Sequence, residues 1–301
     1  MFKPKRATLQ TNRRFFVNKL NVSFKVVLAG LVTALVGVGC AKSATDAKLV
    51  STALVMTGSS QPTSIANYKK VNPLLQFLSP TAVALAPPAM TDSGSRVIAL
   101  TQAWVTIKEI EFKLAETAGV EVESAEVKFK GPYFVDLLSN IPAAFGTAEI
   151  PAGVYRRVKM KLEKDSGIPA GAPTQLAGNS IYLQGTVSGL AFTYSAQDGT
   201  EFKISGPGGV TLSETTNMVI GVKVSDLFRM INMDAVHAAA NKDISDANRI
   251  STGSVSACPL IDVSLRDIAA CFRKGLEKAG KFGKDSDNDG EIEVGDDEVQ
   301  D

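Results

Sequence analysis

Short runs in which apolar and polar residues alternate dominate the chain from residue 96 to residue 227. The clearest run covers residues 155–163, where Val158, Met160 and Leu162 share one parity and basic residues take the other. Because successive side chains of a strand point to opposite faces, this run predicts a strand with one buried and one solvent-exposed face. Similar runs predict strands at 126–129, 134–138, 181–187, 191–194, 201–204, 209–212 and 218–224.

A further predicted strand, WVTIKEIEFK at residues 104–113, changes parity along its length. Val105 and Ile107 have one parity, whereas Ile110 and Phe112 have the other. An extra residue in one strand of a pair produces this change, so the pattern predicts a β-bulge near positions 108 and 109.

Residues that favour turns separate these runs. The glycines of SGPGG at 205–209 predict a hairpin loop between two of the strands. No helical pattern long enough for a parallel crossover lies between the runs, which favours an antiparallel sandwich or barrel. We therefore expect a mainly β protein with an antiparallel β-sandwich domain at 96–227.

The pattern becomes helical after Asp226. Residues 226–239 form one candidate helix, and residues 264–279 form a second. In the second, apolar residues recur at steps of three and four, as an amphipathic helix requires. We expect a small C-terminal helical tail at 228–284.

The N-terminal segment has the pattern of an export signal. Seven Lys and Arg residues lie within the first 25 positions, and the apolar run 26–39 follows them. This run is shorter than the roughly 20 residues that a spanning helix needs. It ends in small residues directly before Cys40, an arrangement that resembles the lipobox of bacterial lipoproteins, although Gly37 stands where an aliphatic residue is usual.

We expect residues 1–39 to be a signal peptide and Cys40 to carry the lipid. A plain secretory signal and an uncleaved anchor with an incidental thiol are the alternatives. Residues 40–95 are rich in Ala, Ser, Thr and Pro and predict a flexible tether that lifts the body away from the lipid. Ala41 and Lys42 give no Asp-type signal for retention at the inner membrane, which favours the outer membrane of a bacterial cell envelope.

The chain has three cysteines, and the two besides Cys40 are Cys258 and Cys271. In an exported protein this pair predicts a disulfide, which would stabilise the fold by about 3 kcal/mol in the chain-entropy model. Two separately buried thiols are the alternative.

The acidic C-terminus, residues 285–301, has the spacing of a calcium loop of the EF-hand type. The candidate oxygen ligands are Asp285, Asp287, Asp289, Glu291, Glu293 and Asp296. They occupy loop positions 1, 3, 5, 7, 9 and 12, with Gly290 at the tight turn. Asp296 is shorter than the usual Glu, so we expect weak binding of calcium. A solvated acidic tail is the alternative.

Composition and motifs exclude several classes of function. The net charge of +1 gives no basic footprint for nucleic acid. The single histidine, His237, has no triad spacing, and no phosphate loop or metalloprotease motif occurs. We expect no enzymatic activity, and a hydrolase that uses two carboxylates is the least favoured alternative.

Three stretches resemble a known family. They are LTQAWVTIKEIEFK at 100–113, GPYFVDLLS at 131–139 and EIPAGVYRRVKMKLEK at 149–164. Together they resemble bacterial lipoproteins grouped as domain of unknown function 4382, over roughly residues 96–227. The resemblance implies a sandwich of immunoglobulin-like or carbohydrate-binding-like type in an envelope protein and no established activity.

We expect a membrane-anchored module that binds a ligand, with a carbohydrate as the first candidate and a scaffold that contacts other envelope proteins as the alternative. The candidate sugar platform consists of Trp104, Tyr133, Tyr155, Tyr182 and Tyr194, which could equally pack in the core. A basic strand edge could meet acidic glycans or lipid headgroups, or could protect a sheet edge; it consists of Arg156, Arg157, Lys159 and Lys161. A contiguous aromatic groove would favour the carbohydrate, and a broad apolar patch would favour the scaffold.

Overall fold

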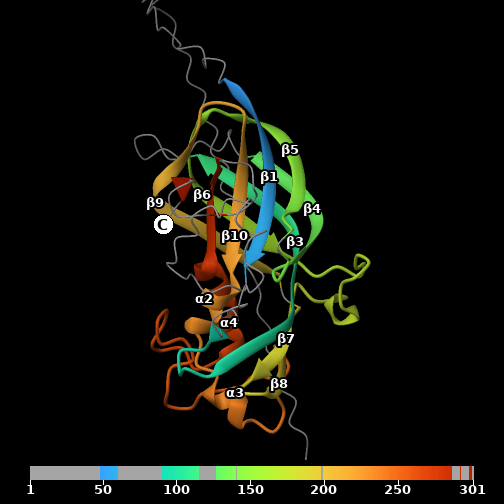
Figure 1. Ribbon diagram of the computed structural model, residues 1–301, viewed down its shortest axis with the longest axis vertical. Coiled ribbons are helices and arrows are strands. Elements are labelled where there is room, and N and C mark those ends of the chain that lie inside the picture. Colours follow the sequence, from blue (N-terminus) through green and yellow to red (C-terminus); the bar gives the residue numbers. More distant parts are fainter. Residues whose placement is uncertain are drawn as a thin grey trace, which may run out of the picture. The chain divides into compact units, whose positions relative to one another are not determined.

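Two β-sheets form the body of the protein (Figure 1). The computed structural model describes residues 48–59, 90–114, 127–139, 141–197, 199–286, 292 and 298–299. The first sheet has the order β13-β12-β10-β1-β5. Its strands are β1 (Leu49–Ser59), β5 (Ala143–Pro151), β10 (Thr216–Lys223), β12 (Gly280–Asp285) and β13 (Glu298–Val299).

The second sheet has the order β11-β8-β7-β3-β6-β9, and β2 and β4 also pair with β3. Its strands are β2 (Met90–Thr91), β3 (Val97–Leu114), β4 (Val127–Asp136), β6 (Gly153–Leu162), β7 (Ile181–Val187), β8 (Leu190–Ala196), β9 (Thr200–Leu212) and β11 (Asp243–Ile244). The mainly β class is confirmed. Most pairs are antiparallel, but β1 pairs with β10 and β11 with β8 in parallel. A parallel pair needs a long connection, and the strands of the second sheet supply one between β1 and β10.

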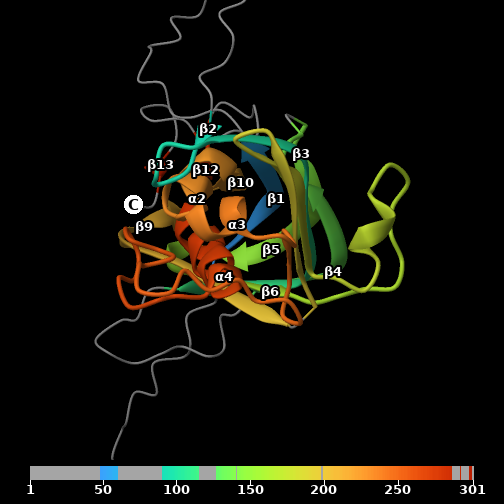
Figure 2. The same ribbon diagram turned by 90° about the horizontal axis from the view of Figure 1, so that it is seen from below.

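Within the described residues, three α-helices lie at the end of the first sheet where β1 and β10 finish (Figure 1): α2 (Val224–Arg229), α3 (Asp234–Ala238) and α4 (Ile268–Ala279). A short 3-10 helix, η2 (Thr174–Leu176), precedes β7. Figure 2 shows α2, α3 and α4 gathered at this end, with strands of both sheets around them. No helix within the described residues is long and apolar enough to cross a membrane.

Helix α4 belongs to the core. Its Phe272 stacks on Tyr194 of β8 with ring centroids 4.4 Å apart and also meets Phe228 of α2 edge to face. After α4 the chain returns to the first sheet as β12, which pairs with β10. The small helical element expected near the C-terminus is confirmed, and residues 228–284 in addition close the sandwich, because α4 packs in the core and β12 joins the first sheet.

The pattern of β6 and the predicted bulge are confirmed. Val158, Met160 and Leu162 are buried, whereas Arg157 and Lys161 are exposed. The register of β3 against both β4 and β6 shifts between residues 107 and 109. The hairpin loop expected at 205–209 is wrong: this segment lies within β9, and a register shift sets residues 205–210 against residues 155–157 of β6.

Strand β1 lies inside the segment expected to be a flexible tether, so the tether expectation is wrong for residues 49–59. The side chains of Val50, Thr52, Leu54 and Met56 are buried, which is the two-residue period of a strand. Pairing with β10 on one side and β5 on the other explains why a segment rich in Ser, Thr and Ala is ordered. Residues 60–89 of the expected tether lie outside the described residues.

Candidate functional site

Several predicted site residues lie outside the part of the chain that the structure describes. They are Cys40, Asp287, Asp289, Glu291, Glu293 and Asp296. Asp285 is described: it ends β12, pairs with Asn217 of β10 and has a buried side chain. The described residues hold no group of three His, Cys, Asp or Glu side chains arranged for a metal ion. Calcium binding therefore stays a prediction about the acidic segment.

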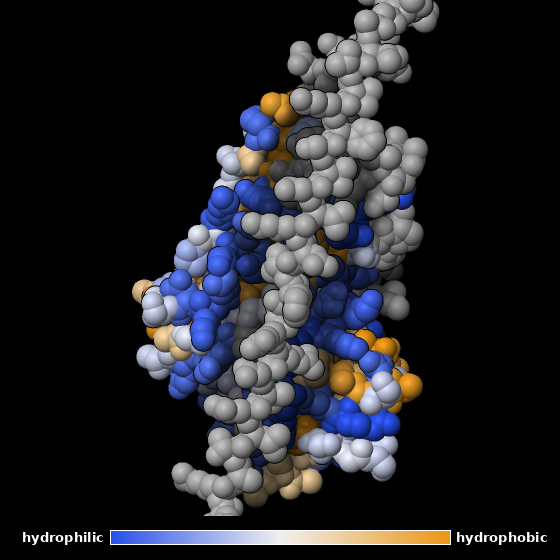
Figure 3. Space-filling model, turned by 180° about the vertical axis from the view of Figure 1, so that it is seen from behind, coloured by the Kyte–Doolittle hydropathy of each residue, from blue (hydrophilic) through white to orange (hydrophobic). Residues whose placement is uncertain are grey.

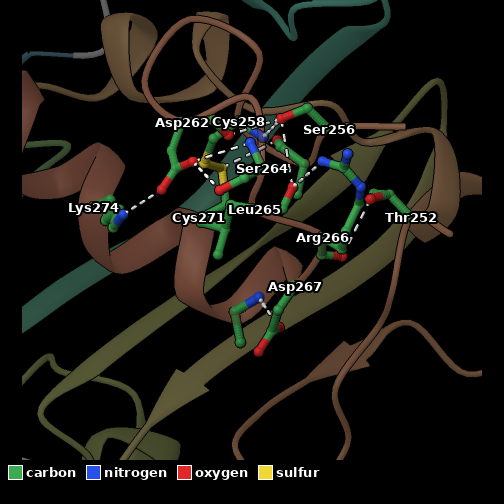
Figure 4. The surroundings of a disulfide bond; sticks show 12 residues. Thr252, Ser256, Cys258, Asp262, Ser264, Leu265, Arg266, Asp267, Cys271 and Lys274 are labelled. Carbon is green, nitrogen blue, oxygen red and sulfur yellow. Dashed lines mark hydrogen bonds and ion pairs between the residues drawn. A yellow bond between two sulfur atoms is a disulfide. The ribbon is translucent and has the colours of Figure 1, made fainter. Parts of the chain in front are cut away.

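The predicted disulfide between Cys258 and Cys271 is confirmed. The two Cα atoms are 5.6 Å apart, and both side chains are fully buried. Figure 4 shows how the bond joins α4 to the preceding segment, residues 251–267, which we call the disulfide loop. The loop is thereby fixed to an element that belongs to the core.

Hydrogen bonds hold the disulfide loop along its whole length (Figure 4). At its base, the backbone N–H of Thr252 donates to the carbonyl oxygen of Arg266 at 2.9 Å, and the Thr252 hydroxyl donates to the same oxygen at 3.1 Å. Nearer its tip, the Ser256 hydroxyl donates to the carbonyl oxygen of Asp262 at 2.9 Å. These bonds and the disulfide together make the loop a rigid projection.

Asp262 links the tip of the loop to α4. Its Oδ2 lies 2.6 Å from Lys274 Nζ, and its Oδ1 accepts from the Ser264 backbone N–H at 3.0 Å and from the Ser264 hydroxyl at 2.6 Å. The hydrogen bond from Lys274, followed by those from Ser264, holds the pKa of the Asp262 carboxyl well below its usual range. At the other end of the loop Asp267 caps α4 by accepting from the Ala269 N–H at 2.9 Å.

This rigid loop exposes large apolar side chains. Val255, Leu260 and Val263 are 55%, 67% and 72% exposed, while Ile261 and Leu265 pack against the core. In Figure 3 apolar atoms gather at the lower right, where this end of the molecule lies. Three exposed apolar side chains on one fixed loop are candidates for contact with a partner.

The five aromatic candidates do not form a contiguous exposed platform. Tyr155 and Tyr194 are fully buried, and Tyr182 is nearly so. Burial raises the pKa of the Tyr155 hydroxyl to about 12. Tyr133 is half-buried and packs on Phe145 with ring centroids 4.6 Å apart. Trp104 is half-buried and lies beside Tyr182 in the β3–β7 register.

The basic residues of β6 do not form a sheet edge, because β6 lies between β3 and β9. Lys159 Nζ lies 2.8 Å from Glu201 Oε2 and 3.7 Å from Glu111 Oε2, and Lys128 Nζ lies 2.8 Å from Glu111 Oε1. Burial raises the pKa of Glu111, but the lysines outweigh this effect, so its pKa lies below the ordinary value. The expected protection of a sheet edge is wrong: these charges form a ladder across four strands.

Residues that could carry catalysis have structural partners. The side chain of Asp92 is fully buried and accepts hydrogen bonds from the backbone N–H groups of Gly94, Arg96 and Met233. His237 is half-buried on α3, where its backbone N–H donates to the Met233 carbonyl oxygen. Sequence reasoning missed the Asp92 network because its bond from Met233 spans 141 residues, and it missed the apolar loop because the pattern does not show which side chains stay exposed.

Comparisons with known proteins identify the family. No curated protein and no solved structure matched the chain. The family model described as Domain of unknown function (DUF4382) matches residues 89–243, which is more than half of the chain. This range contains the elements from β2 to α3 and the first residue of β11, whereas β1, the disulfide loop, α4 and β12 lie outside it. The match confirms the resemblance of the three sequence stretches, and the chain belongs to the DUF4382 family.

Proposed function

We propose that this protein is a lipid-anchored envelope protein that binds another protein through the apolar tip of its disulfide loop. The observation that carries the proposal is the exposure of Val255, Leu260 and Val263 on a loop held by a disulfide and by hydrogen bonds. An aromatic groove would have favoured a sugar-binding module, and an apolar patch a scaffold. The loop exposes three apolar side chains, whereas the aromatic candidates are mostly buried.

The physical argument concerns both burial and order. Burial of an apolar side chain contributes about 1.5–3 kcal/mol, so a partner that covers all three would gain several kcal/mol. The loop is already fixed, so binding would cost little conformational entropy. Asp262 and Lys274 border the apolar tip as an ion pair, which resembles the polar rim of a protein interface.

Support for the anchor comes from the sequence. The basic and apolar segments before Cys40 have the order of a lipoprotein signal. A disulfide between Cys258 and Cys271 fits an oxidising compartment outside the cytosol. Ala41 and Lys42 support the outer membrane over the inner one.

Photo-crosslinking in the native host tests the proposal. Benzoylphenylalanine replaces Leu260 in one version of the chain and Ile141 in the control, because Ile141 is an equally apolar residue, 75% exposed, on the β4–β5 connection. We expect a defined protein adduct at position 260 and none of that mass at position 141. Equal adducts at both positions would contradict the proposal.

Reconstitution with the purified partner completes the test. Leu260→Asp should weaken binding at least about tenfold, because it removes apolar burial and brings a charge into the interface. Ile141→Asp should leave binding unchanged. Equal affinities of the two variants would overturn the assignment of the loop.

A second candidate function, carbohydrate binding, has one specific observation in its favour. The half-buried Trp104 pairs with Tyr182, whose ring is nearly buried and whose hydroxyl donates to Gln184 Oε1 at 3.2 Å, and Thr193 donates to Asp243 nearby. Aromatic rings beside amide and carboxylate groups suit a sugar. Retention on immobilised polysaccharides that Trp104→Ala abolishes, and that Leu260→Asp does not, would favour this candidate.

A further inference from the structure

We infer that the end of the sandwich at which β1 begins lies on the membrane surface and contacts anionic lipid headgroups through Lys48, Leu49, Arg156 and Arg157. The inference rests on the proposed lipid anchor at Cys40. It adds an orientation of the sandwich on the membrane and a second interaction surface. It follows from the finding that residues 49–59 of the expected tether form strand β1.

The length of chain between the anchor and the fold limits the geometry. β1 begins at Leu49, nine positions after Cys40. Nine fully extended residues span about 30 Å at most. β1 itself has 11 residues, which corresponds to about 36 Å at the usual rise of a strand. A connection shorter than β1 keeps the start of this strand near the lipid.

The same limit excludes the opposite orientation. β10 runs parallel to β1 and leads directly into α2, so the helices lie at the end where β1 finishes (Figure 1). The disulfide loop connects to α4 at this same end. If this end met the membrane, the start of β1 would be farther from the lipid than the connection reaches. The disulfide loop therefore faces away from the membrane.

The contacts of Lys48 and Leu49 identify which other segments share the membrane-facing end. Leu49 pairs with Pro151, and the Ala152 N–H donates to the carbonyl oxygen of Lys48 at 2.7 Å. Lys48 Nζ donates to the carbonyl oxygen of Ser213 at 2.8 Å. This end thus contains the β5–β6 and β9–β10 turns, and the first half of β6 begins there.

The side chains at this end suit a lipid surface. Leu49 is 57% exposed, and Lys48, Arg156 and Arg157 are exposed. Within the described residues, no carboxylate forms an ion pair with either arginine, whereas Lys159, farther along β6, lies between two glutamates.

Acidic residues also lie near this end of the first sheet, where β12 ends at Asp285, opposite Asn217 of β10. Glu149 is exposed near the same end, and Glu214 lies 3.7 Å from Lys284. The two arginines, which form no ion pair with a described carboxylate, are attracted to anionic headgroups, and the exposed Leu49 can enter the interface.

Lipid photo-crosslinking of the acylated full-length chain tests the orientation. The vesicles contain phosphatidylglycerol and phosphatidylcholine, and benzoylphenylalanine replaces Leu49 or, as the matched control, Val263 on the disulfide loop. We expect at least about five times more lipid adduct at position 49 than at position 263. An equal or reversed ratio would overturn the orientation.

A charge variant tests the headgroup contact. Arg156→Gln combined with Arg157→Gln should lower the adduct yield at position 49 in these vesicles by about fivefold or more, since each cation contributes to the attraction. The control Arg229→Gln changes an exposed arginine of α2 at the far end and should have no effect. Equal yields for the double variant and the native chain would overturn the role of the arginines.

A separate readout distinguishes failure of the anchor from failure of the orientation. Incorporation of radiolabelled lipid that Cys40→Ser abolishes reports the anchor alone. A chain that incorporates no lipid would overturn the proposed anchor and the orientation with it. A chain that is acylated but shows no preference for position 49 would overturn the orientation and leave the anchor in place.

Discussion

Removal of the Asp92 carboxylate should destabilise the fold strongly, because this buried group connects two distant parts of the chain. Oδ1 accepts from the backbone N–H groups of Gly94 at 2.9 Å and Arg96 at 2.7 Å. Oδ2 accepts from the Met233 N–H at 2.9 Å, across a sequence separation of 141 residues. The β2–β3 turn is thereby held against the connection between α2 and α3.

The expected cost follows from these three bonds. In Asp92→Ala the buried N–H of Met233 loses its partner, which costs about 1–3 kcal/mol. The N–H groups of Gly94 and Arg96 lie nearer to solvent and should each cost about 1 kcal/mol. The total is about 3–5 kcal/mol, and Asp92→Asn, which keeps one acceptor oxygen, should lose about half as much.

Urea denaturation followed by fluorescence of Trp104, the one tryptophan in the chain, measures the effect. The control is Asp234→Ala, which removes the exposed carboxylate that pairs with Arg96. It should cost less than about 1 kcal/mol, as exposed ion pairs do. Equal losses for Asp92→Ala and Asp234→Ala, or a loss below about 1 kcal/mol for Asp92→Ala, would refute the reasoning.

Three further predictions concern the disulfide, the free energy of unfolding at low pH and the binding of calcium. Cys258→Ala combined with Cys271→Ala should lower the free energy of unfolding by about 3 kcal/mol, measured by urea denaturation, because the unfolded chain regains the entropy of a closed loop. Glu111 has a lowered pKa, so its carboxylate stabilises the fold above its ordinary pKa of 4.5, and this contribution is lost as the pH falls. Glu111→Gln should therefore flatten the decline of unfolding free energy between about pH 5 and pH 3. Calcium should release heat on titration into the native chain but not into Asp287→Ala combined with Asp289→Ala, and identical isotherms would exclude the acidic loop as the site.

The sequence predicts best those strands whose apolar period is strong. β7 begins and ends as predicted at residues 181 and 187, because alternating and β-branched residues lie between clear turn residues. The parity change in β3 correctly predicts a bulge, since a bulge is the ordinary way for a strand to keep both halves buried. The disulfide was predictable from two features of the sequence: an N-terminal segment with the pattern of an export signal, and a single remaining pair of cysteines.

Elements whose order depends on distant partners escaped prediction. β12 has the sequence GKFGKD, in which Phe282 is the one large apolar residue, and β1 is rich in Ser, Thr and Ala. Neither has a strong local period. Both become strands because they flank β10, whose Met218, Val219 and Ile220 are fully buried. Pairing between segments that are far apart in the sequence leaves little trace in local pattern.

The contacts that fix the candidate site span at most 14 residues, yet the sequence does not show which of them form. Exposed apolar residues at 255, 260 and 263 look in sequence like part of a loop before a helix, and only the disulfide and the hydrogen bonds make them a fixed surface. The aromatic residues, which local reasoning favoured as a platform, are mostly used by the core.

The folding unit must therefore extend beyond the range that the family model matches. Residues 89–243 include β10 but neither of its neighbours, β1 and β12. Without them both edges of β10 would be open, and Leu54, Met56 and Phe282 would be missing from the core. Open edges and missing apolar contacts both favour aggregation over folding. Because β1 belongs to this unit and begins nine positions after Cys40, the proposed lipid anchor would lie within about 30 Å of the sandwich.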